Sequence, residues 1–260
     1  MSKKIRNLFK FKNNKGSYIL LICPATAFGL GIWQVTRRNW KLELIENIDK
    51  RTNADPIVIE THKQLDNEYP EYTLVKLKGI FDNDREVFVG PRMLIQDSVP
   101  KRFTKNMPWP IGYNLITPMK LICNSQTVLI NRGWVPKEKL YSETRERTQL
   151  DGVVEIQALV RTTNEEQSMV GVKSNSKKFK NLSDPNIVVF NQKNREEIAK
   201  LLGTSHWLAD QTFDEKVAEF GGPLGGQTRV ILRNEHLQYI FTWFALGIAT
   251  TFIWVKSFRF

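Results

Sequence analysis

Residues 16–36, GSYILLICPATAFGLGIWQVT, and residues 236–255, HLQYIFTWFALGIATTFIWV, decide the architecture of this chain because neither contains a charged side chain. A helix needs roughly 20 apolar residues to cross the hydrocarbon core of a bilayer. Aromatic residues near the ends of both stretches fit the headgroup-level belt of membrane proteins: Tyr18, Trp33, Tyr239 and Trp254. The stretches therefore predict two transmembrane helices. The alternatives are two buried helices of a soluble protein, or a signal peptide followed by a core helix.

The excess of positive charge lies mainly at the two ends of the chain. The 260 residues contain 38 Lys and Arg against 27 Asp and Glu, a net charge of +11. Residues 1–16 carry six Lys and Arg and no acid, and residues 256–260 carry Lys256 and Arg259. A nucleic-acid-binding protein would gather this charge on its folded domain, so we expect no nucleic-acid partner. The positive-inside bias instead predicts both termini in the cytoplasm or mitochondrial matrix, although Arg37, Arg38 and Lys41 weaken that bias.

These features predict five segments along the chain. They are a basic head at 1–16, a first transmembrane helix at 17–36, an extramembrane β-rich domain at 37–235, a second transmembrane helix at 236–255 and a basic tail at 256–260. Both spans offer a groove of small residues for helix packing, at Ala25 and Gly29 and at Gly247 and Thr251.

The segment between the spans has the pattern of a β domain. The first span continues as a helix that ends at Asn53–Pro56. Short alternating runs then predict strands at 73–81, 86–92, 112–119, 126–136, 153–162, 186–191 and 228–233. One helix is expected at 194–203, with Gly203 as its C-cap. No strand–helix–strand rhythm appears, so we expect an α+β membrane protein, with a mainly antiparallel β domain and one or two helices between the spans.

Glycines and polar segments indicate where strands bend or stop. Gly79 and Gly133 fall within strand-like runs, where glycine permits a bulge or a close backbone approach. Residues 163–185 are polar and are expected to form a mobile surface loop. The glycine-rich segment GGPLGG at 221–226 lacks the Lys-Ser/Thr pair and the following helix of a phosphate loop, so it is interpreted as a flexible turn.

No catalytic motif stands out, and we expect that the protein is not an enzyme. The chain contains no nucleophile elbow, no P-loop and no zinc-protease motif. Cys23 and Cys123 are the only cysteines, which excludes a disulfide framework and a C-x-x-C motif. No pair of residues, including Asp82 and Asp84, indicates a hydrolase with its site in the β domain.

His236 is the candidate metal-ligating residue. It stands at the start of the second span, and Tyr239 and Trp243 follow at i+3 and i+7 on the same helix face. A ring nitrogen beside aromatic side chains at a bilayer interface suits an axial ligand of haem iron. The alternative is an interfacial histidine that caps the helix start and carries no ligand.

Three arginines are candidates for the same site. Arg37 follows the end of the first span, at the membrane face where His236 begins the second span, and Arg229 and Arg233 precede that second span. Guanidinium groups around an aromatic pocket suit haem propionates. The same residues would equally suit lipid headgroups.

Three sequence blocks resemble the surfeit locus protein family, the assembly factors of cytochrome c oxidase. They are GIWQVTRRNWKLELI at 31–45, VLINRGWVP at 128–136 and GGPLGGQTRVILRNEHLQYIFTW at 221–243. Weaker similarity extends through 76–92 and 112–118, so that the resemblance covers nearly the whole chain.

The resemblance implies a two-span protein of the mitochondrial inner membrane with its large domain in the intermembrane space. It implies a chaperone-like role in maturing the core catalytic subunit of the oxidase, with haem a as cofactor and His236 as its ligand. Membrane lipids, that core subunit and its assembly intermediates would be the partners. The alternatives are a structural subunit of a respiratory complex and a membrane-anchored enzyme.

Overall fold

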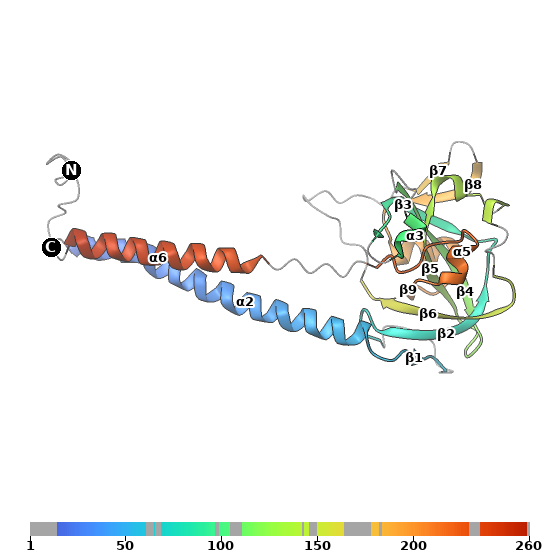
Figure 1. The fold of residues 1–260 in the computed structure, drawn as a ribbon, viewed down its shortest axis with the longest axis horizontal. Coiled ribbons are helices and arrows are strands. Elements are labelled where there is room, and N and C mark those ends of the chain that lie inside the picture. Colours follow the sequence, from blue (N-terminus) through green and yellow to red (C-terminus); the bar gives the residue numbers. More distant parts are fainter. Residues whose placement is uncertain are drawn as a thin grey trace. The chain divides into compact units, whose positions relative to one another are not determined.

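The chain divides into a helical pair and a β domain, which are described separately (Figure 1). The helical pair comprises Met1–Asp49 and Ile231–Phe260, and the β domain comprises Lys50–Val230. The computed structural model describes residues 15–60, 65, 69–96, 99–104, 111–141, 143–145, 150–163, 178–181, 184–228 and 235–258.

The helical pair contains the two apolar stretches. The 3-10 helix η1, Lys15–Leu21, leads into the long helix α2, Ile22–Thr52, and the chain ends in α6, His236–Phe258. Helical segments Tyr18–Thr52 and His236–Lys256 are long and apolar enough to cross a membrane. Only 22% and 6% of their most apolar windows are buried, unlike a core helix of a soluble protein. The predicted helix end is confirmed, since α2 stops just before Asn53.

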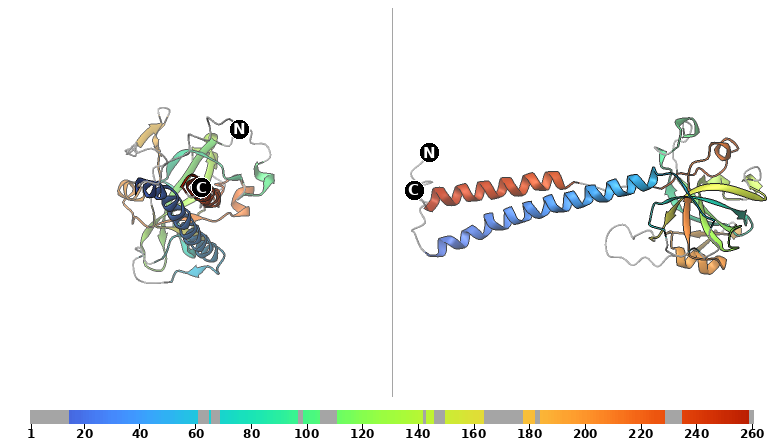
Figure 2. Two further views of the ribbon diagram at one scale, coloured as in Figure 1. Left: turned by 90° about the vertical axis from the view of Figure 1, so that its left-hand side faces the viewer. Right: turned by 90° about the horizontal axis from the view of Figure 1, so that it is seen from below.

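The two long helices run antiparallel within this unit and lie side by side in both ribbon views (Figures 1 and 2). Aromatic contacts follow the antiparallel order: Tyr18 lies 6.2 Å from Trp254 and Phe28 lies 6.1 Å from Phe244, measured between ring centroids. Each helix also presents a glycine to a phenylalanine of the other. A Cβ atom on Gly31 would lie 3.1 Å from Phe244, and one on Gly247 would lie 3.0 Å from Phe28. Close approach at glycine is a common means of packing apolar helices.

The predicted groove of small residues faces the partner helix at Gly247 but not at Ala25 and Gly29. Nothing lies within 4 Å of a Cβ atom placed on Gly29, and Ala25 is exposed. The buried face of α2 in the span instead follows Pro24, Ala27 and Gly31. The contact with α6 includes Gly31 and lies on another side of α2 than the predicted groove. Gly29 therefore points away from α6.

In the described part of the β domain, nine strands form one sheet in the order β1-β2-β6-β9-β5-β4-β3-β8-β7. Their bounds are β1 Ile57–Val58, β2 Leu74–Phe81, β3 Val87–Met93, β4 Ile111–Leu121, β5 Thr127–Pro136, β6 Val153–Arg161, β7 Lys178–Asn181, β8 Asp184–Phe190 and β9 Leu208–Gln211. Short helices lie between them: α3 Lys101–Thr104, η3 Lys137–Lys139, α4 Arg195–Leu202 and α5 Glu215–Glu219.

An additional pairing of β2 with β4 closes β2, β6, β9, β5 and β4 into a barrel. Strand β4 makes this possible because its first part pairs with β3 and its last residues pair with β2. Apolar side chains of these strands fill the interior, among them Leu77, Met119, Ile130 and Ile156, together with Trp207 just before β9. Buried residues alternate with more exposed ones along β2, so that one face of the strand points into the barrel.

Helix α4 covers a second apolar cluster outside the barrel. Its residues Ile198, Ala199 and Leu202 pack with side chains of β3, β4, β5, β8 and β9. The helix begins at the Asn194 side chain, which accepts hydrogen bonds from two backbone amides, and ends at Gly203 in the left-handed conformation. The predicted helix at 194–203 and its glycine cap are thus confirmed.

The mainly antiparallel sheet is confirmed, with three parallel pairings that the sequence did not predict. They join β1 to β2, β3 to β8 and β5 to β9. The run at 208–211 escaped prediction because its sequence, LADQ, has no apolar alternation. The predicted strand at 228–233 lies outside the described residues except for Thr228, which is not in a strand.

Two predicted loops differ from the structure. Within 163–185, residues 178–181 form β7 and pair antiparallel with β8, because strand pairing uses backbone groups and tolerates a polar sequence. Residues 164–177 and 182–183 lie outside the described residues. The segment 221–226 is not a flexible turn: Leu224 exchanges two backbone hydrogen bonds with Trp134, and Gly226 N donates to Gln211 O at 2.8 Å.

Gly133 allows this segment to lie on β5. Its φ is +128°, and a Cβ atom there would lie 2.2 Å from the Leu224 carbonyl oxygen. Gly79 is similarly confined, since its Cβ atom would lie 2.5 Å from the Lys120 carbonyl oxygen. The predicted close backbone approaches at Gly79 and Gly133 are therefore confirmed.

Replacement of Gly133 is expected to destabilise the β domain. Gly133→Ala should lower the free energy of unfolding by about 2–4 kcal/mol, because it combines a strained φ with a backbone collision. Gly152→Ala is the matched control: its φ is +78°, but nothing lies within 4 Å. We expect about 1–2 kcal/mol there. Equal losses for the two variants, measured by thermal unfolding in detergent, would show that the contact with Leu224 contributes nothing.

Replacement of Gly247 is expected to disturb the helical pair. Gly247→Leu forces a large side chain against Phe28 and should cost about 1–3 kcal/mol, the usual range for overpacking. Gly29→Leu adds the same side chain where space is open and should leave helix melting unchanged. Far-UV circular dichroism of the full chain in detergent measures both, and a larger loss for Gly29→Leu would contradict the packing described above.

Candidate functional site

The candidate site surrounds the first residue of α6. His236 Nδ1 lies 2.6 Å from Gln34 Oε1 of α2, within the same helical unit. A side-chain amide oxygen only accepts hydrogen bonds, so the proton of the neutral imidazole resides on Nδ1. The other nitrogen, Nε2, then keeps its lone pair. The contact with Gln34 thus fixes the tautomer that can bind a metal through Nε2.

Aromatic side chains flank this histidine along α6. Because α6 is helical from His236 onward, Tyr239 and Trp243 follow at i+3 and i+7 on one face, as predicted. Tyr239 is 48% exposed and Trp243 is partly buried. On α2, Trp33 is 55% exposed one residue before Gln34. The structure therefore combines an oriented imidazole with accessible aromatic surface.

Of the three predicted arginines, only Arg37 lies among the residues that the structure describes. Arg37 lies on α2 and stacks its guanidinium carbon 4.0 Å from the centroid of the Trp40 ring. Arg229 and Arg233 lie outside the described residues. Gln34 is a site residue that the sequence prediction did not include. The signal for it is its place at the end of the first span, on the membrane face where His236 begins the second span.

A buried ionic cluster centred on Asp210 is the most strongly charged interior feature of the β domain. Asp210 is 1% exposed and accepts from Lys193 Nζ and Arg161 Nη1, each at 3.0 Å. Asn131 Nδ2 and Thr228 Oγ1 donate to the same carboxylate, each at 2.8 Å. Four donors from separate parts of the chain therefore converge on one carboxylate.

These donors keep Asp210 ionised. Burial alone would raise the pKa of Asp210, but Lys193, Arg161 and the donated hydrogen bonds outweigh it and lower that pKa to about 2. Arg161 also donates to Glu71 at 3.1 Å. The cluster is thus a structural network that holds the Asp210 carboxylate in its charged form.

A second buried network joins Glu86 to two arginines. Arg145 Nη2 lies 2.5 Å from Glu86 Oε2, and Arg132 Nη1 lies 3.8 Å from Glu86 Oε1. Burial lowers the pKa of Arg132 to about 10 against the opposing charge of Glu86, so the guanidinium stays protonated at neutral pH. The Arg132 guanidinium also lies 4.8 Å from the Phe81 ring centroid. Sequence reasoning gave no sign of either network, because the partners lie far apart along the chain.

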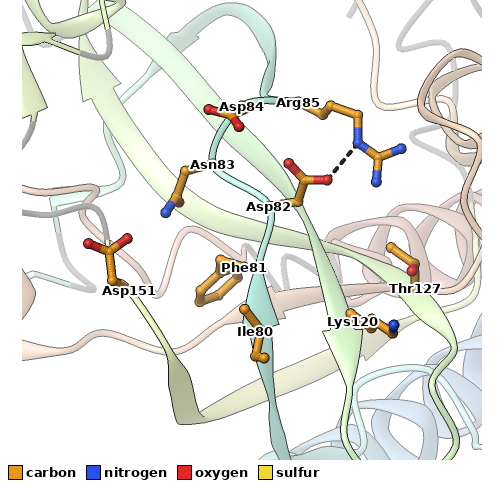
Figure 3. Close-up of a pocket in the computed structure, with 9 residues that line it drawn as sticks. All are labelled: Ile80, Phe81, Asp82, Asn83, Asp84, Arg85, Lys120, Thr127 and Asp151. Atoms are coloured by element: carbon orange, nitrogen blue, oxygen red, sulfur yellow. Dashed lines mark hydrogen bonds and ion pairs between the residues drawn. The ribbon is translucent and has the colours of Figure 1, made fainter.

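A hollow of about 450 Å³ opens at the turn between β2 and β3 (Figure 3). Asp82 in this hollow forms an ion pair with Arg85 at 2.6 Å, and Arg85 also donates to the Leu202 carbonyl at 2.7 Å. This pairing gives Asp82 a structural role at the turn. The lining consists of Ile80, Phe81, Asp82, Asn83, Asp84, Arg85, Lys120, Thr127 and Asp151.

Taken together, the chain is a β-barrel domain flanked by two apolar helices, with an oriented histidine at the start of the second helix. The model of the SURF1 family matches residues 21–248, which include most of both helices and the whole barrel. The chain therefore belongs to the SURF1 family.

Individual relatives are similar over nearly the whole chain. Surfeit locus protein 1 of Homo sapiens is 36% identical over 246 residues, covering 93% of this chain and 77% of the relative. Surfeit locus protein 1 of Takifugu rubripes is 37% identical over 246 residues, covering 93% of this chain and 96% of the relative. The SURF1-like protein of Drosophila melanogaster is 35% identical over 244 residues, covering 92% and 76%.

Asp210→Asn is expected to destabilise the β domain by about 3–5 kcal/mol, because it leaves buried Lys193 and Arg161 without their shared counter-charge. Asp82→Asn is the matched control. It removes an exposed ion pair and should cost less than about 1 kcal/mol. Unfolding of the full chain in detergent, followed by near-UV circular dichroism, measures both.

The same measurement has a defined pH dependence. The folded pKa of Asp210, about 2, lies below the usual value of about 3.9, so its stabilisation is present above pH 4 and is lost as the pH falls toward 2. Asp210→Asn should remove this loss of stability at low pH. If the free energy of unfolding of the variant falls with pH as steeply as that of the wild type, the low pKa does not belong to Asp210.

Proposed function

We propose that this chain is a non-enzymatic assembly factor of cytochrome c oxidase, anchored in the mitochondrial inner membrane by α2 and α6. In this proposal it presents haem a to the core catalytic subunit and its assembly intermediates. The observation that carries the proposal is the contact of His236 Nδ1 with Gln34 Oε1 at 2.6 Å, which leaves Nε2 free for an axial bond. Membership of the SURF1 family supports the assembly role that the sequence blocks imply.

Membrane anchoring is supported by the two apolar helices and by the distribution of charge. Two antiparallel spans place both ends of the chain on one side. Six Lys and Arg without an acid in residues 1–16 favour the matrix side for those ends. The β domain would then lie in the intermembrane space.

The donor set of the chain suits a haem group better than a bare metal ion. Among the described residues, no group of three or more His, Cys, Asp or Glu side chains could hold a metal ion. The macrocycle of a haem already binds its iron, so that one imidazole is sufficient from the protein. When bound, haem a would supply an iron that accepts a nitrogen ligand, and His236 would hold it.

The residues of the chain have distinct roles in this proposal. His236 would hold the iron through Nε2, and Gln34 would keep the imidazole in the required tautomer and orientation. Tyr239 and Trp243 would supply apolar contact for the macrocycle from the same face of α6. Arg37 remains a candidate for a propionate only if its guanidinium leaves Trp40.

A non-enzymatic role is supported by the state of the interior charges in the β domain. Asp210 and Glu86 are each saturated by cationic partners. Catalytic acids and bases instead need a pKa near the working pH. We therefore propose that the protein binds haem a and presents it to the core catalytic subunit, and that it catalyses no reaction itself.

His236→Ala should insert into the membrane normally but copurify with at least about tenfold less haem, since it loses the axial bond. His236→Met should restore part of the haem with a shifted Soret band, because a thioether can also bind iron. The measurement is the absorption spectrum of detergent-purified full chain from cells that make haem a. His206→Ala, which removes an exposed histidine of the β domain, is the matched control and should keep its haem.

Gln34→Leu provides a second variant that retains the ligand. It should bind haem with lower occupancy and a shifted reduction potential, because the imidazole loses its orienting acceptor. Equal haem content in wild type and His236→Ala would refute the ligand assignment. A haem-free wild type from such cells would refute the haem-presenting role and leave a scaffold.

A further inference from the structure

Arg37, Trp40 and Lys41 form a cationic and aromatic cluster on α2, here called the Trp40 cluster. The Arg37 guanidinium carbon lies 4.0 Å from the centroid of the Trp40 ring, and Lys41 Nζ lies 5.4 Å from the same centroid. The Trp40 side chain is 46% exposed. Two cations are thus held against one accessible aromatic ring, within the usual distance of a cation–π contact.

The positive charge of this cluster is not neutralised within the described structure. Neither Arg37 nor Lys41 has an acid three or four residues away along the helix, where side chains on one face meet. The ion pairs among the described residues join other cations to carboxylates. Arg38 adds a third charge to the same turn. The cluster therefore presents a concentrated positive charge to its surroundings.

The depth of the cluster follows from the length of the span. The charge-free stretch ends at Thr36, so residues 37–41 occupy the next 7–8 Å or so of helix. The polar layer of a bilayer is about 5–8 Å thick on each side of the hydrocarbon core. Given the membrane anchoring proposed above, on which this inference rests, the Trp40 cluster lies among the lipid headgroups.

No described helix of the pair covers the cluster. Helix α6 begins at His236, whose contact on α2 is Gln34, and the antiparallel contacts run from there toward Tyr18 and Trp254. One turn below Arg37 on the same face of α2, Trp33 is 55% exposed. An occupant with a phosphate above and an apolar chain beneath would match both parts of this surface.

We infer that the Trp40 cluster binds the phosphate of an anionic phospholipid in the leaflet on the β-domain side of the membrane. Arg37 offers a planar pair of donors to the phosphate oxygens, and Lys41 adds a point charge. Trp40 holds both cations in place and contacts the glycerol region with its exposed edge. The exposed Trp33, one turn below Arg37, lies against the acyl chain.

The inference is tested by the lipid that the full chain retains. Wild type and the double variant Arg37→Gln, Lys41→Gln are reconstituted in vesicles of phosphatidylcholine with 20% phosphatidylglycerol, extracted in mild detergent and washed. The phospholipid retained per protein is then measured by mass spectrometry. Wild type should retain phosphatidylglycerol in preference to phosphatidylcholine, and the double variant should bind it about thirtyfold more weakly, as expected for two lost surface charges.

The double variant Lys50→Gln, Arg51→Gln is the matched control. It removes the same charge from the last turn of α2, about 14 Å further along the helix, and should retain phosphatidylglycerol like the wild type. Equal loss in this control would show a net-charge effect and overturn the site. Displacement of the lipid by millimolar glycerol phosphate would also overturn it, by showing a site for soluble phosphate.

Resistance to alkaline carbonate extraction is measured first for every variant. Extraction of the wild type would refute the membrane anchoring of the proposed function. An integrated wild type without preference for phosphatidylglycerol would refute the lipid site alone. Because the haem spectrum of each variant is recorded in parallel, loss of lipid with unchanged haem would assign Arg37 to the lipid and not to a propionate.

Discussion

The absence of a side chain at Gly133 is the constraint on which the β domain depends. Leu224 can exchange two backbone hydrogen bonds with Trp134 only because the carbonyl of Leu224 occupies the space that a Cβ atom on Gly133 would fill. This contact seats Leu224 in an apolar cluster with Trp134, Leu94 and Val99. The residues that follow then reach Gln211 and Asp210 through Gly226 and Thr228. A single position without a side chain thus secures the path of residues 224–228 along the barrel.

The sequence was sufficient where a local pattern determines the structure. The charge-free stretches, the helix closed by Gly203 and most strands could be predicted, because each depends on hydropathy or capping within a few residues. Gly79 and Gly133 could be marked as close approaches for the same reason. What could not be predicted is which distant segments meet. The strand at 208–211 lacks alternation since it contributes Asp210 to a buried ionic cluster, and its partners follow from the folded topology alone.

The helical pair illustrates the same limit on a smaller scale. Spacing identified small residues on both helices, but only the fold decides which of them faces the partner. Gly247 meets Phe28 and Gly31 meets Phe244, whereas Gly29 faces away. For the candidate site, the sequence identified His236, but its hydrogen bond to Gln34 joins residues 202 positions apart and is set by how the two helices pair. Orientation of the imidazole is thus a property of helix pairing.

The ends of the sheet have a consequence for how such a protein behaves beside unfinished polypeptides. Within the described residues, the sheet ends at β1, which has two residues, and at β7, which has four and the sequence KFKN. Short edges that carry lysine are poor templates for adding a foreign strand. A sheet with a long, flat, apolar edge would risk pairing with an exposed strand of an incompletely folded polypeptide. The short edges of this sheet disfavour such mixed sheets.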